Sequence, residues 1–334
     1  MKERIHWIDV ARGIGMLLVI YGHTIDDRQY RYLIYAFHMP FFFFLSGMLF
    51  HPAPFRHFLK RSTQTLLIPY LFLAAATYGI GHFTDSNPLT WARFWGDFWG
   101  VIYGSGANGG LGYNIILWFL PCLFVTRMLY YGIQNYAKTT PFIITWLFFF
   151  SGLGFAYTRL FPDSHLPFGL ETAFTAVVFF GAGALLMEQQ KLTSWIQSHR
   201  WQLLLVSIPL WLIAAQLNFQ WFGNQIDMRI GHLNNYALFY IGALAGILMT
   251  VILSMLINAN RVLEYIGKHT LALLGWQFLA FLYIYNIYIA LHVSPVIAEW
   301  KERFNGIIST GLATTGILAV DYLWHRGEKL LLRK

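Results

Sequence analysis

The stretch WIDVARGIGMLLVIYGHTI, from Trp7 to Ile25, resembles a membrane-spanning run, yet it carries Asp9, Arg12 and His23. About 20 predominantly apolar residues in a helix span the hydrocarbon core of a membrane. Ionisable side chains within such a helix are costly, so they usually face the interior of a bundle or a water-filled cavity. The stretch therefore predicts a membrane helix with one functional polar face.

Arg12 and His23 are expected to share that face. They are eleven positions apart, which on an α-helix places them about 20° apart around the axis and about 16 Å apart along it. Arg12 would lie near the cytoplasmic end of a polar cavity, with His23 about three turns deeper. The alternative is that Arg12 is an interface residue reaching for water and His23 a hydrogen-bonded packing residue.

The composition of the whole chain indicates an integral membrane protein. Of 334 residues, 57% are hydrophobic and 11% charged, against about 25% charged in an average soluble domain. Apolar blocks recur to the C-terminus, which argues against a removable signal peptide. We expect an all-α fold, a single membrane domain over residues 1–334, with about ten spans. Their predicted limits are 8–25, 33–50, 62–82, 111–131, 141–160, 171–188, 201–219, 235–257, 270–291 and 305–325.

The basic residues follow the pattern of membrane topology. With the N-terminus inside, most of the 23 lysines and arginines fall on the cytoplasmic side, as the positive-inside rule requires. This predicts an even number of spans and both termini in the cytoplasm. The net charge of +8 is scattered rather than gathered in a stripe, so no nucleic acid is expected as a partner. The single cysteine, Cys122, excludes an intramolecular disulfide, and no metal site is predicted.

Several blocks together resemble the membrane-bound acyltransferase-3 family. Besides the Arg12 to His23 spacing, they are FHMPFFFFLSG (37–47), a basic cluster before LLIPY (66–70), LWFLPCLFV (117–125) and IGKHTLALLGWQF (266–278). The compact chain is similar to the sugar O-acetyltransferases without an appended extracytoplasmic domain. The resemblance implies ten spans in a bacterial inner membrane. It also implies acyl transfer from acyl-CoA, with acetyl-CoA the expected donor, to a hydroxyl of a cell-envelope or exported glycan.

The same resemblance makes Arg12 and His23 the essential pair. The chain departs from the family pattern at two places. The basic motif of the family is often two arginines three positions apart, whereas this chain has Arg56, Lys60 and Arg61. The late motif often ends in histidine where this chain has Gln277.

The chemistry of ester formation requires a base near the acceptor hydroxyl, a polarised thioester carbonyl and a site for the donor's phosphates. Histidine is the side chain best matched to accept a proton at neutral pH, so His23 is the expected general base. Arg12, Arg56, Lys60 and Arg61 would bind the phosphates of acyl-CoA, which is a substrate, and no permanently bound cofactor is expected. For the last three residues, the alternative is a purely topological role.

Other polar residues are weaker candidates. His38 stands before Pro40, where the helix is expected to kink, and is either structural or a contact of the acceptor. Glu171 opens a predicted span and is either a capping or interface residue, a contact of the acceptor or a catalytic carboxylate. Asp26, three positions after His23, is either a partner of that histidine or part of a solvated loop. The repeat of Trp91, Trp95 and Trp99 is either a membrane-interface anchor or a stacking surface for sugar.

Two other functions fit the same polar face. A transporter or flippase for a glycan or lipid-linked saccharide would line a permeation path with it and would need no acyl donor. A noncatalytic scaffold would need His23 only for stability. The order of the family-like blocks favours acyl transfer over both.

Overall fold

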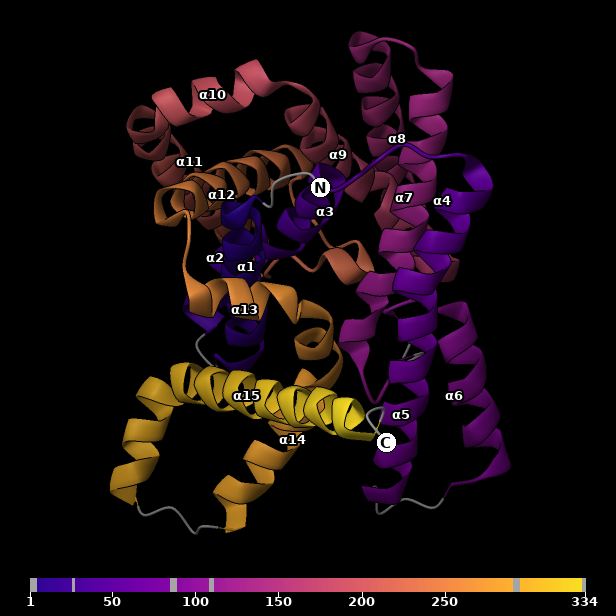
Figure 1. The fold of residues 1–334 in the computed structure, drawn as a ribbon, viewed down its shortest axis with the longest axis vertical. Coiled ribbons are helices and arrows are strands. Elements are labelled where there is room, and N and C mark those ends of the chain that lie inside the picture. Colours follow the sequence, from indigo (N-terminus) through magenta and orange to yellow (C-terminus); the bar gives the residue numbers. More distant parts are fainter. Residues whose placement is uncertain (1–4, 26–27, 85–88, 108–110, 291–294, 332–334) are drawn as a thin grey trace. The chain divides into compact units, whose positions relative to one another are not determined.

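The computed structural model describes residues 5–25, 28–84, 89–107, 111–290 and 295–331. Within these ranges all regular elements are helices, apart from an isolated β-bridge between Asp227 and His232 (Figure 1). The predicted all-α class is thereby confirmed. In the part of the chain that the structure describes, seven helices are long and apolar enough to cross a membrane: 55–84, 115–136, 140–160, 167–188, 200–222, 236–257 and 306–326. The protein is thus a multi-pass membrane protein, while the count of ten and the cytoplasmic termini stay predictions.

The chain forms two compact units. One combines residues 1–34 with residues 253–334, and the other contains residues 35–252. The expectation of a single domain over residues 1–334 stays a prediction.

The first unit is built around α1 (His6–Thr24), which contacts three helices from the far end of the chain. These are α13 (Arg261–Lys268), α14 (Thr270–Ala290) and α15 (Pro295–Leu331). Helix α1 starts two residues before the predicted span of 8–25 and ends one residue inside it. Most residues in its N-terminal half are buried, and most of these are apolar. The first unit therefore joins the two ends of the chain.

The second unit is centred on α9 (Leu170–Glu188), which contacts α3 (His38–Met48), α7 (Phe119–Tyr136) and α8 (Thr140–Leu160). Its other helices are α4 (Phe55–Ser62), η1 (Thr63–Leu67), α5 (Ile68–Thr84), α6 (Trp91–Tyr103), η2 (Ile115–Trp118), η3 (Pro167–Gly169), α10 (Gln190–Ser198), α11 (Arg200–Phe222), η4 (Met228–Ile230) and α12 (Tyr236–Ile257), of which the last five residues belong to the first unit.

The predicted span of 33–50 is interrupted. Helix α2 (Arg28–Tyr35) ends two residues before α3 begins at His38. Pro40 lies in the first turn of α3, where a missing N–H leaves no helical hydrogen bond unmade. The predicted bend near His38 is therefore a complete break between two helices.

A second proline has a local effect on α5. Pro69 has no N–H to donate to the preceding turn, and residues Thr63–Leu67 form a π-helix just before it. The Thr65 hydroxyl donates to the Arg61 carbonyl at 2.8 Å. Because π-turns of this kind often occur at functional sites, the position of this one directly after the basic cluster supports a role for that segment.

Candidate functional site

Arg12 is held by two side chains from different parts of the first unit. Its Nη2 donates to Thr270 Oγ1 at 3.0 Å, and its Nη1 lies 3.6 Å from Asp9 Oδ1. The Arg12 side chain is 31% exposed and that of Asp9 only 12%. A guanidinium has five N–H donors, so it can contact an anionic ligand while it keeps these two partners. The arrangement thus presents a fixed, half-buried positive charge.

Two glycines bring α13 close enough to α1 to position Thr270. A Cβ on Gly267 would stand 2.0 Å from the Asp9 carbonyl oxygen, and one on Gly13 would stand 2.2 Å from the Leu263 carbonyl oxygen. Both distances are far below van der Waals contact, so only glycine allows this approach. The IGKHT segment of the late motif therefore has a structural explanation: it packs against α1 and supplies the Arg12 partner.

Further charged groups surround the same end of α1. His6 Nδ1 lies 3.1 Å from Glu264 Oε1, and Lys268 Nζ lies 3.9 Å from Glu264 Oε2. Sequence reasoning assigned no role to Glu264, Thr270 or Asp9. For Asp9 a signal was present, because residues three apart on a helix are neighbours.

His23 is oriented by the backbone of its own helix. Its Nδ1 lies 2.7 Å from the Val19 carbonyl oxygen, one turn earlier. A carbonyl oxygen can only accept, so Nδ1 carries the hydrogen, and the lone pair of the neutral ring is on Nε2. His23 is exposed, and Nε2 is the atom suited to take a proton. The suggested partner Asp26 lies outside the described residues.

The residue after His23 attaches this end of α1 to α15. Thr24 Oγ1 donates to the Gly306 carbonyl at 2.9 Å and lies 2.9 Å from Thr310 Oγ1. Because His23 is adjacent in the chain, these bonds limit its movement relative to α15.

The weaker candidates His38 and Glu171 lie in the second unit and are both buried. His38 is 3% exposed, and its ring centroid is 4.7 Å from that of Tyr35. Glu171, 1% exposed, accepts a hydrogen bond from the Leu166 backbone N–H at 3.1 Å and lies 3.3 Å from His165 Nδ1. These contacts give Glu171 a structural function in the turn before α9, and an acceptor contact by either residue stays a prediction.

Arg56, Lys60 and Arg61 all lie exposed on α4. The structure adds Arg127 of α7, whose guanidinium carbon lies 5.3 Å from the centroid of the Phe58 ring. Arg127 and Arg61 are close enough for their like charges to repel each other. The cluster therefore has four basic residues rather than three.

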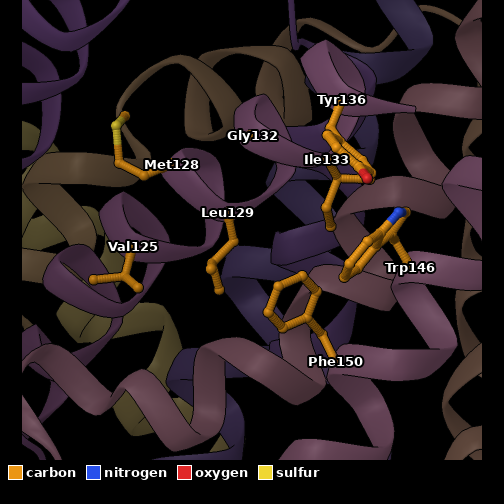
Figure 2. A pocket seen from close by; sticks show the side chains of 8 residues that line it. All are labelled: Val125, Met128, Leu129, Gly132, Ile133, Tyr136, Trp146 and Phe150. Atoms are coloured by element: carbon orange, nitrogen blue, oxygen red, sulfur yellow. The ribbon is translucent and has the colours of Figure 1, made fainter. Parts of the chain in front are cut away.

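An apolar cavity of about 350 Å³ lies in the second unit between α7 and α8 (Figure 2). Figure 2 shows Leu129, Ile133 and Phe150 lining it, with Tyr136 and Trp146 at one side. Its lining has no charged side chain, and the phenol of Tyr136 is its one ionisable group. Among the described residues, no group of three histidine, cysteine or acidic side chains is arranged to hold a metal ion.

The position that departs from the family pattern is deeply buried. Gln277 on α14 is 0% exposed and its Nε2 donates to the Leu274 carbonyl at 3.3 Å. Its Oε1 has no hydrogen-bond partner among the described residues. An uncharged amide is thus tolerated in the core where a charged imidazolium would be more costly.

Comparison with known proteins identifies the family of the chain. A family model for an acyltransferase domain, that of the acyltransferase-3 family, matches residues 5–322. No curated protein and no solved structure matches the chain. The matched range includes α1 with Arg12 and His23, the basic cluster on α4 and the α13–α14 segment that holds Arg12. Because the match covers nearly the whole chain, the protein belongs to the acyltransferase-3 family and is a membrane acyltransferase.

Proposed function

We propose that this protein is an O-acyltransferase that moves an acyl group, most simply acetyl, from acyl-CoA to a hydroxyl of a cell-envelope or exported glycan. His23 is the general base in this proposal. The observation that supports it best is the hydrogen bond from His23 Nδ1 to the Val19 carbonyl, 2.7 Å long, which makes Nε2 the basic nitrogen. Membership of an acyltransferase family favours transfer over the transporter alternative.

In the proposed reaction, His23 Nε2 accepts the proton of the acceptor hydroxyl as its oxygen attacks the thioester carbonyl carbon. The new C–O bond forms and the C–S bond breaks. The CoA thiolate then takes the proton back from the imidazolium and leaves as the thiol. The bond to Val19 persists in both protonation states, because Nδ1 carries a hydrogen in each.

The anionic donor is proposed to bind to arginine and lysine side chains. Arg12, fixed by Asp9 and Thr270, supplies one positive charge at the opposite end of α1 from His23. The helix rise between these residues, about 16 Å, is comparable with an extended pantetheine arm. Arg56, Lys60 and Arg61 are proposed as further phosphate ligands, and a bacterial inner membrane is the proposed location.

The decisive experiment follows label from donor to product. Inverted membrane vesicles with the wild-type protein are supplied with acetyl-labelled acetyl-CoA, and label in base-labile glycan esters is measured. We expect label with the wild type and none with His23→Ala. His199→Ala is the matched control, because His199 Nδ1 makes the same bond with the carbonyl one turn earlier, Trp195 O at 3.0 Å.

Absence of ester label in the wild type, together with absence of saturable acetyl-CoA and succinyl-CoA binding, would contradict the proposal. Equal label in wild type and His23→Ala would leave acyl transfer in place and remove the assigned base.

A further inference from the structure

A larger cavity, about 790 Å³, lies in the second unit between α5 and α6. Its volume is within the usual range of ligand pockets. Most of its lining is apolar, and the residues that matter here are Leu71, Ala74, Gly79, Phe94, Phe98 and Val101. Three ionisable side chains, Tyr78, His82 and Asp97, also face it. An apolar pocket with a few convergent polar groups is the usual form of a small-molecule site.

The polar groups at this cavity form a connected chain. Arg93 Nη2 donates to the Tyr113 hydroxyl, whose oxygen lies 3.3 Å from His82 Nδ1. His82 Nε2 lies 3.2 Å from Asp97 Oδ2. If the Tyr113 O–H points to Nδ1, the hydrogen of the neutral His82 ring is on Nε2 and faces the carboxylate. The chain thus ends on an acceptor at the cavity wall.

Asp97 can accept a further hydrogen bond. Its Oδ2 is buried, and although His82 Nε2 lies 3.2 Å away, no described residue donates an aligned hydrogen bond to it. Buried polar atoms in native proteins nearly always have a partner. A ligand group that donates a hydrogen bond would supply it, and the nearby positive charge of Arg93 disfavours a cationic group.

The outer face of α6 indicates at which level of the membrane the cavity lies. Trp91, Trp95 and Trp99 are 75%, 48% and 62% exposed, on one side of the helix. Tryptophan concentrates at the boundary between lipid tails and water. His82 lies in the last turn of α5, at the end of a span-length helix. Both features place the polar end of the cavity at the level of lipid head groups.

We propose that this cavity binds a membrane amphiphile with an apolar chain and a hydroxyl head group. The chain lies against Leu71, Phe94 and Phe98, and the hydroxyl donates to Asp97. The site shares no residue with the proposed acyl-transfer site, so the two proposals can fail separately.

The test uses the purified full-length protein and a photoreactive hexadecanol, with its methyl ether as the matched probe without a donor. We expect saturable labelling of peptides from residues 71–83 and 94–102, with the ether about tenfold weaker or more. Asp97→Leu, which removes both acceptor oxygens, should abolish the difference between the two probes. The control Asp163→Leu, at an exposed loop position, should leave it unchanged.

A second variant tests the cavity without touching its polar groups. A Cβ on Gly79 meets no atom within 4 Å, so Gly79→Leu fills the space without a backbone clash and should block both probes. Equal labelling by alcohol and ether in the wild type would overturn the proposal. So would labelling that survives Gly79→Leu, absence of saturable labelling, or tighter binding of hexadecylamine than of the alcohol.

Discussion

The two ends of α1 hold their ionisable side chains in different ways. Arg12 contacts Asp9 on its own helix and Thr270 on α14, and Gly267 allows the necessary packing. His23 is exposed and is oriented by the carbonyl of its own helix at Val19. The Arg12 side chain thus depends on a distant part of the chain for its position, and the His23 ring on the geometry of its own helix. A fixed charge is suited to bind a donor, and an exposed imidazole to exchange a proton.

The largest effect is expected at the histidine end. His23→Ala should lower kcat by about 10²- to 10⁴-fold, the usual contribution of a general base, with little change in the KM for acyl-CoA. Steady-state kinetics with purified protein measure both constants. A rise in KM with kcat preserved would place His23 in binding instead and erase the difference between the two ends.

Arg12→Ala should act on binding. Loss of a charge-assisted hydrogen bond to a donor phosphate should raise the KM for acyl-CoA by about 10- to 100-fold. Titration of acyl-CoA against initial rate checks this, with Arg159→Ala as the control because Arg159 is exposed and donates to the Asn234 carbonyl. If both variants shift KM equally, a general loss of positive charge explains the result and Arg12 has no special role.

The packing of α13 against α1 near Arg12 can be disrupted without changing Arg12 itself. Gly267→Ala places a methyl group 2.0 Å from the Asp9 carbonyl oxygen, and overpacking of this kind costs about 1–3 kcal/mol. We expect a lower melting temperature and a raised KM for acyl-CoA. Gly311→Ala, on α15 of the same unit, meets no atom within 4 Å and should be neutral or slightly stabilising. Equal melting temperatures for the two variants would show that α1 and α13 do not need this approach.

The smallest effects are expected from substitutions of two threonines, one at each end of α1. Thr270→Val removes a partner of Arg12 and should raise the KM for acyl-CoA by about two- to tenfold, the value of one ordinary hydrogen bond. Thr24→Val removes the bonds to Gly306 and Thr310 and should lower the melting temperature without changing that KM. Kinetics and thermal unfolding of both variants distinguish the two ends, and a KM increase confined to Thr24→Val would reverse the assignment.

Local patterns predicted much of this molecule. The apolar block of 8–25 is a continuous helix from His6 to Thr24, so the shared face of Arg12 and His23 follows from helix periodicity. Seven other predicted blocks coincide with span-length helices. The span of 33–50 was wrong as a single helix, because hydropathy does not report the break before His38.

What the sequence alone determined is the membrane class, the helical blocks and the placement of Arg12 and His23 on one helix, since these depend on hydrophobicity and on residues within a few turns. Tertiary structure decided the rest. Thr270 meets Arg12 across 258 positions, and Tyr113 meets His82 across 31. Such contacts depend on how separate helices pack, and in the case of Arg12 on the glycine-mediated approach of two backbones, which no short pattern encodes.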